Sequence, residues 1–133
     1  MKQKMLILIS VMAVSVGLAL SLMAADSGAK TPAKLRHVVA FKFKSTATSE
    51  QIKQVEEAFR GLKKKIPQIA EFEWGLNNSP EKHNKGCTHG FILTFKSEKD
   101  RDDYLPHPAH KEFGQLVGPL LDDVFVIDFW AKD

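Results

Sequence analysis

Cysteine is almost absent from this sequence: the 133 residues contain one, Cys87. A single thiol forms no disulfide within the chain, which excludes the disulfide-stabilised mini-proteins. Stability must therefore come from a hydrophobic core, which is feasible but marginal for roughly a hundred residues. We expect Cys87 to be buried and inert, because no basic or helix-terminal neighbour is implied that would activate its thiol.

The sequence also lacks a strong excess of charge of one sign. Its net charge is +3, and without Lys2 and Lys4 it is 3 − 2 = +1. Positive and negative residues alternate along the chain, as in "KSEKDRDD", and no basic stripe with interleaved aromatic residues is present. This pattern argues against nucleic acid as a partner. No internal repeat and no second domain are apparent.

One long hydrophobic run is present, from Met5 to Met23. It follows two lysines and is followed by Ala24 and Ala25, which is the pattern of a secretory signal. We therefore predict a signal segment over residues 1–25, a linker over 26–34 and a secreted or periplasmic protein. The run is also close to the roughly 20 residues that span a bilayer. An uncleaved N-terminal anchor therefore remains the alternative, and contact with a membrane is expected only in that case.

The rest of the chain predicts an α+β domain over residues 35–130. Alternating apolar residues indicate strands, and apolar residues at a helical spacing indicate helices. The predicted strands cover residues 35–44, 70–76, 88–96 and 124–130, and the predicted helices cover 48–66, 97–105 and 108–117. The order β-α-β-β-α-β is that of the ferredoxin-like fold.

Both faces of the predicted sheet carry apolar residues, although helices can cover only one of them. One face is expected to hold the aromatic sets of the strands, and the other is expected to hold Val38, Ala40, Ile92, Val124 and Val126. A sheet with two apolar faces needs a second cover, and another copy of the same sheet would supply it. We therefore predict a homodimer whose sheets face each other.

Five segments in order resemble the stress-responsive dimeric α/β-barrel family, often called Dabb: "HVVAFKFK", "FEWGLNNSPE", "KGCTHGFILTFKS", "YLPHPAHKEF" and "VFVIDF". The resemblance implies a ferredoxin-like protomer and a dimeric barrel, and most members have no assigned reaction. One branch, a plant polyketide cyclase, carries out an aldol condensation without cofactor or metal. Its catalytic tyrosine and histidine fall on Tyr104 and His110. Its orienting acid falls on Asp128, and a further pocket tyrosine falls on Phe59.

The stretch "YLPHPAHKEF" admits two interpretations. Pro108 cannot lie inside one continuous helix, and His107 before it is pushed toward extended geometry, so the stretch suits a joint between two helices. Alternatively, the joint is an acid–base site. Asp128 would then orient His110 as a general base, and Tyr104 would donate its hydroxyl to a developing enolate oxygen. Both interpretations stay open.

Other candidate ligand-binding residues are His37, His89 and His107, together with Phe59 and Trp74. His37 and His89 fall on apolar strand faces, where a histidine is either a hydrogen-bonded core residue or part of a cavity lining. No metal or other cofactor is expected, because the histidine spacing matches no closed metal motif. Two functions follow: a non-catalytic barrel that binds a small molecule, and a cofactor-independent enzyme that acts on a carbonyl compound.

Overall fold

The computed structural model describes residues 33–132, so the predicted signal segment lies outside it. Within this range the elements follow the predicted order: β1 (Leu35–Phe43), α1 (Ser49–Lys65), β2 (Glu71–Leu76), β3 (His89–Phe95), α2 (Glu98–Tyr104), α3 (Pro108–Val117), a 3-10 turn (Gly118–Leu120) and β4 (Leu121–Trp130). None of the helices in residues 33–132 has the length and apolar character needed to cross a membrane.

Local signals in the sequence place the helix boundaries. Thr48 caps α1 in a capping box, because its side chain accepts from the backbone N–H of Gln51 and its own N–H donates to the Gln51 side chain. The side chain of Ser97 caps α2 by accepting from the backbone N–H of Asp100. Such caps satisfy backbone donors that have no partner inside the helix. The predicted helix starts are confirmed to within a residue.

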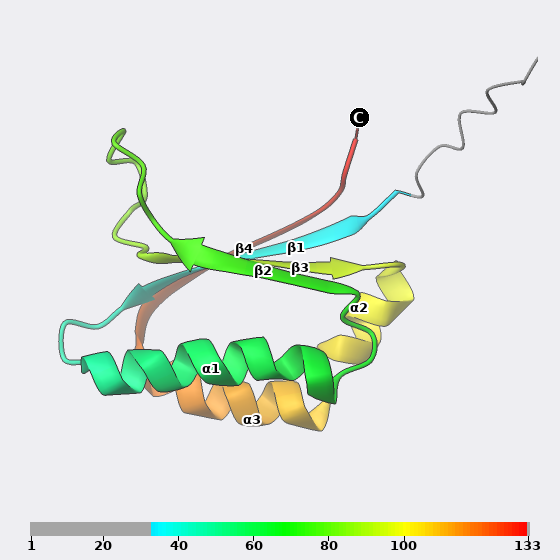
Figure 1. The fold of residues 1–133 in the computed structure, drawn as a ribbon, viewed down its shortest axis with the longest axis horizontal. Coiled ribbons are helices and arrows are strands. Elements are labelled where there is room, and N and C mark those ends of the chain that lie inside the picture. Colours follow the sequence, from blue (N-terminus) through cyan, green and yellow to red (C-terminus); the bar gives the residue numbers. More distant parts are fainter. Residues whose placement is uncertain (1–32, 133) are drawn as a thin grey trace, which may run out of the picture. The chain divides into compact units, whose positions relative to one another are not determined.

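The four strands form one antiparallel sheet in the order β2-β3-β1-β4. Figure 1 shows α1 and α3 side by side beneath one face of this sheet, while no helix from residues 33–132 covers the other face. The ferredoxin-like fold is therefore confirmed. The strand β4 begins at Leu121 rather than at the predicted residue 124, because Leu121 and Asp123 pair with β1 around a register shift at Lys42 and Phe43.

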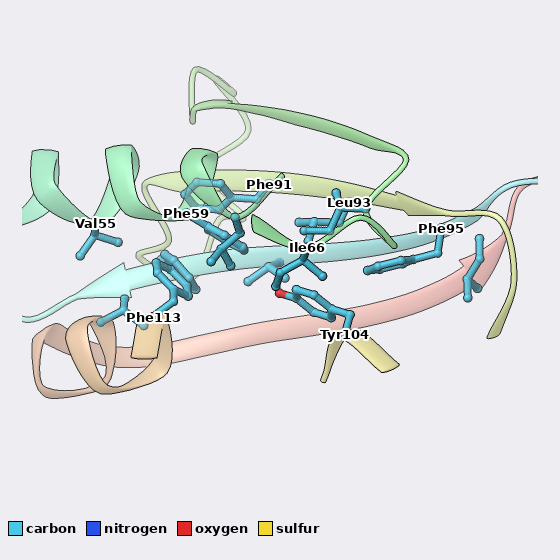
Figure 2. Close-up of a cluster of buried hydrophobic side chains, with 14 residues drawn as sticks. Val55, Phe59, Ile66, Phe91, Leu93, Phe95, Tyr104 and Phe113 are labelled. Carbon is cyan, nitrogen blue, oxygen red and sulfur yellow. The ribbon is translucent and has the colours of Figure 1, made fainter. Parts of the chain in front are cut away.

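The core lies between the sheet and the helices, and Figure 2 shows its side chains. Phe41 and Phe91 reach it from the sheet, and Phe59 and Phe113 reach it from α1 and α3. The rings of Phe59 and Phe113 are stacked with centroids 4.4 Å apart. Burying such side chains contributes roughly 1.5–3 kcal/mol each, so this aromatic cluster is a main source of stability.

Val38, Ala40 and Ile92 lie on the uncovered face, as predicted, because they alternate with buried residues and Val38 pairs directly with Ile92. Val124 and Val126, however, lie on the helix-covered face, because they pair directly with Phe41 and Val39. Side chains opposite each other in an antiparallel pair point to the same face. In β4 the uncovered face instead carries Phe125, Ile127 and Phe129, all of them exposed. The predicted placement of Val124 and Val126 was wrong by one residue of register.

Candidate functional site

The stretch from Tyr104 to Phe113 forms the joint between α2 and α3. Pro108 is the first residue of α3, as predicted, and His107 is the N-cap with φ −58° and ψ 135°. Nδ1 of His107 accepts a hydrogen bond from the backbone N–H of Ala109, 3.2 Å away. A proline fits the first helical position because it has no N–H to satisfy. His107 therefore has a structural role at the joint.

Tyr104 ends α2 and is fully buried, with 0% of its surface exposed. Its hydroxyl has no hydrogen-bond partner within residues 33–132, and Figure 2 shows the oxygen directed into the cluster of apolar side chains. Burial, with a smaller effect of the Asp128 carboxylate, raises the pKa of Tyr104 well above its usual value. The phenol therefore stays protonated and can donate a hydrogen bond, but no acceptor for it lies within the described residues.

Two histidine rings pack against the ring of Tyr104. His110, from the first turn of α3, has its ring centroid 4.2 Å from that of Tyr104, and His37, from β1, has its centroid 5.8 Å away. His110 is partly exposed, whereas His37 is buried. The structure therefore brings Tyr104, His110 and His37 together at one end of the core.

The predicted pairing of Asp128 with His110 is not found; Asp128 binds other partners. Its Oδ1 accepts from Nδ1 of His37 at 2.6 Å, and its Oδ2 accepts from Nη1 of Arg101 at 2.9 Å. His37 and Asp128 are register partners on β1 and β4, which places the two side chains on the same face. The carboxylate is thus compensated, as a partly buried charge requires. Its orienting effect falls on His37.

His110 is oriented by the backbone. Its Nδ1 lies 2.9 Å from the carbonyl oxygen of Leu105. A carbonyl oxygen only accepts, so Nδ1 carries the proton and Nε2 is the remaining nitrogen of the ring. Leu105 follows Tyr104 directly, so the turn between α2 and α3 fixes both the position and the tautomer of His110. This is the role that had been predicted for Asp128.

A hollow of about 750 Å³ lies on the uncovered face of the sheet, away from Tyr104, His110 and Asp128. Its floor is formed by Gly75, Gly90 and Ala40, which pair in a row across β2, β3 and β1. A Cβ atom added at either glycine would meet no heavy atom within 4 Å. The hollow therefore exists because three neighbouring strands carry almost no side chain at this level.

Two of the predicted ligand-binding residues, His89 and Trp74, line this hollow. His89 is buried and bonded at both nitrogens, with Nε2 2.9 Å from Glu56 Oε1 and Nδ1 2.8 Å from Thr88 Oγ1. Cys87 also borders the hollow and is half-buried rather than buried.

The predicted ligand-binding residues therefore do not share one cavity. His37 belongs to the Tyr104 cluster, and His107 caps α3. Phe59 lies in the middle of the core. In the part of the chain from 33 to 132, no three histidine, cysteine or acidic residues are grouped as metal ligands.

Arg101 was not identified from the sequence, although it belongs to the site. It lies on α2 three residues before Tyr104, a spacing that puts two side chains on the same helix face. Its Nη1 binds Asp128, and its Nε binds Asp102 at 2.9 Å. The i,i+3 spacing from the candidate tyrosine is the signal that would have pointed to it.

Comparisons with known proteins agree with this fold. Residues 35–131 match the family described as "Stress responsive A/B Barrel Domain", or Dabb. The protein HS1 of Arabidopsis thaliana, which contains such a domain, is 37% identical over 101 residues, covering 76% of this chain and 91% of HS1. Olivetolic acid cyclase of Cannabis sativa is 27% identical over 98 residues, covering 74% of this chain and 97% of the cyclase.

Solved structures show the same likeness. A hydroxynitrile lyase from Passiflora edulis superimposes with a TM-score of 0.73 at 27% identity, covering 77% of this chain and 97% of the lyase. A dimeric ferredoxin-like protein of unknown function from Jannaschia sp. CCS1 superimposes with a TM-score of 0.64 at 25% identity, covering 72% of this chain and 97% of that protein.

Proposed function

Because the chain belongs to the stress-responsive A/B barrel domain (Dabb) family, we propose that it is a homodimeric barrel that binds a small carbonyl compound beside Tyr104 and His110. Dimeric ferredoxin-like neighbours support the assembly. So does the uncovered face of the sheet, where Phe125, Ile127 and Phe129 are exposed side by side on alternate positions of β4. Exposed apolar patches of this kind mark interaction surfaces.

The main support for a ligand is the buried hydroxyl of Tyr104, which has no hydrogen-bond partner within residues 33–132. A buried hydroxyl without a partner costs roughly 1–3 kcal/mol, and buried tyrosines normally find an acceptor. A ligand carbonyl is such an acceptor. The raised pKa of Tyr104 keeps the phenol protonated and able to donate. The hollow on the uncovered face is the less favoured place for this ligand, since a second copy of the sheet would cover it.

Access to Tyr104 runs past His110 in this proposal. The His110 ring packs on Tyr104 and is partly exposed, so a rotation about its side-chain bonds opens a path to the phenol. Rotations of partly exposed side chains take place within nanoseconds. The ligand then lies between the hydroxyl of Tyr104 and the ring of His110.

A catalytic role is the second candidate, and the tautomer of His110 favours it. With Nδ1 donating to Leu105, Nε2 is free to remove a proton from the carbon next to the ligand carbonyl. The electron pair of the broken C–H bond moves to the carbonyl oxygen, and Tyr104 donates a hydrogen bond to the enolate that forms. The similar proteins named as a cyclase and a lyase support an enzyme of this kind.

Acetophenone in D2O tests both candidates, because it has an apolar body, one carbonyl and exchangeable protons beside it. We expect perturbed NMR signals of Tyr104 and His110 on binding, and faster deuterium exchange at the methyl group if the site is catalytic. His110→Gln should slow this exchange by about 10²–10⁴-fold.

His83→Gln is the matched control, since His83 is an exposed histidine that borders the hollow. Binding that depends on His83 rather than on His110 would place the ligand in the hollow and contradict the proposal. Binding of acetophenone without faster deuterium exchange would support the binding function and exclude the catalytic one.

A further inference from the structure

Arg101, Asp128 and His37 form a continuous chain of hydrogen bonds beside Tyr104. Nη1 of Arg101 lies 2.9 Å from Oδ2 of Asp128, and Oδ1 of Asp128 lies 2.6 Å from Nδ1 of His37. The side chains of Arg101 and Asp128 are 23% and 22% exposed, and that of His37 is 8% exposed. These hydrogen bonds therefore lead from the partly exposed Arg101 to the buried His37. The His37 ring packs edge-on against the ring of Tyr104, with the centroids 5.8 Å apart.

Three separate elements supply this chain. His37 and Asp128 face each other across β1 and β4, and Arg101 comes from α2, one turn before Tyr104. The helix that positions the Tyr104 phenol thus also positions the guanidinium of Arg101, which binds Asp128. Both oxygens of the carboxylate are used, so its orientation is fixed from two sides.

This arrangement fixes the tautomer of His37. An ionised carboxylate only accepts hydrogen bonds, so Nδ1 of His37 must carry a proton and Nε2 is left as the nitrogen that can accept. Burial opposes the ionised form of Asp128, but the hydrogen bonds from Arg101 and His37 outweigh it, and the pKa of Asp128 is lowered. Without Arg101, one oxygen of a partly buried carboxylate would lose its donor.

We propose that Arg101 is a positioning residue of the Tyr104 site: through Asp128 it holds His37 against Tyr104 with Nδ1 protonated and Nε2 open to a donor on the ligand. This inference rests on the proposed ligand site and narrows its ligand. The site then offers one donor, the hydroxyl of Tyr104, and two acceptors, Nε2 of His37 and Nε2 of His110. A compound with a hydroxyl next to its carbonyl matches this set better than a plain ketone does.

The first test reads the tautomer and needs no ligand. Long-range proton–nitrogen NMR of the dimeric protein distinguishes a protonated Nδ1 from a protonated Nε2 in His37. We expect a protonated Nδ1 in the wild type. In Arg101→Met, Asp128 is held from one side only and can turn away from His37, so we expect a mixture of both tautomers. Arg101→Lys restores one donor to Asp128 and should recover the wild-type pattern.

Lys99→Met is the matched control for this substitution. Lys99 lies on the same helix and pairs with Asp103, but its side chain is 81% exposed, so it loses the same charge away from the site. A wild-type His37 protonated on Nε2, or an Arg101→Met spectrum identical to that of Lys99→Met, would overturn the inference. If Arg101→Met fails to fold, the wild-type spectrum and Arg101→Gln decide the question.

The second test compares acetophenone with 2-hydroxyacetophenone, which adds a hydroxyl beside the carbonyl. The wild type should prefer the hydroxyketone, and Arg101→Met should reduce that preference by about 10- to 100-fold, by analogy with the loss seen when the hydrogen-bond partner of a metal-binding histidine is removed. An unchanged preference would refute the role of Arg101 in ligand selection. If neither ketone binds, the proposed binding of a carbonyl compound is wrong for these ligands. The tautomer of His37, measured in the first test, still decides whether Arg101 positions His37.

Discussion

Replacing Tyr104 with phenylalanine should stabilise the protein while weakening its function. The substitution removes one buried oxygen that has no partner among the residues the structure describes, and it leaves the ring in place. An unsatisfied buried hydroxyl costs roughly 1–3 kcal/mol. Against this, the oxygen gains only about 0.1–0.2 kcal/mol from each atom that it touches. We therefore expect the free energy of unfolding to rise by about 1 kcal/mol.

Thermal unfolding measures this change directly. For a domain of this size, about 1 kcal/mol corresponds to a rise in Tm of roughly 4–8 °C. Urea unfolding at fixed protein concentration gives the free energy itself, and concentration has to be fixed because dimerisation contributes to apparent stability. In the same variant, the affinity for acetophenone should fall by roughly 2- to 10-fold, the value of one neutral hydrogen bond.

Alkaline titration adds a check on the same residue, because Tyr104 is the single tyrosine of the chain. A raised pKa in the folded state means that the folded protein keeps a proton that the unfolded chain releases above about pH 10. The contribution of Tyr104 is therefore complete below that pH and is lost as pH rises further. Tyrosinate absorbance should appear together with unfolding.

Two results would refute this reasoning. A Tyr104→Phe variant that is less stable by 1 kcal/mol or more would mean that the hydroxyl is hydrogen-bonded in the folded protein. Tyrosinate absorbance that appears in the folded protein near the ordinary pKa of tyrosine would mean that the phenol is not buried.

Two further predictions concern Asp128 and the uncovered face. Asp128→Asn should lower the free energy of unfolding by roughly 1–3 kcal/mol at neutral pH, because it removes charged hydrogen bonds. The lowered pKa of Asp128 implies that its contribution is present above about pH 4 and is lost as pH falls further, so the urea unfolding curves of variant and wild type should converge there. Ile127→Lys should convert the proposed dimer into a monomer in sedimentation experiments, because it places a charge in the middle of the apolar face.

Each of these predictions has a control. Asp102→Asn removes the other carboxylate bound to Arg101, but this side chain is 61% exposed, so we expect a change below about 0.5 kcal/mol. Leu116→Lys introduces the same charge at an exposed position of α3 and should leave the dimer intact. Equal effects of Asp128→Asn and Asp102→Asn would contradict the structural role of the hydrogen bonds that join Arg101, Asp128 and His37. A wild-type monomer at micromolar concentration would contradict the dimer.

Local sequence signals determined the elements of this protein. Alternation with a period of two predicted the strands, and capping residues such as Thr48 and Ser97 placed the helix starts, because these signals act within a few residues. The break in the second helical region followed from Pro108 alone, since a proline inside a helix removes a hydrogen bond and clashes with the preceding turn. The order of the elements then led to the ferredoxin-like fold.

The partners within the candidate site were decided only by the tertiary structure. His37 and Asp128 lie 91 residues apart, and their hydrogen bond depends on the register between β1 and β4. A shift of one residue moves every side chain of a strand to the other face, and no local pattern fixes that shift. The misplaced faces of Val124 and Val126 have the same cause. The sequence by itself identified Tyr104, His110 and Asp128 as candidates. Only the strand register connected Asp128 to His37, and only the packing of α2 against the sheet connected Asp128 to Arg101.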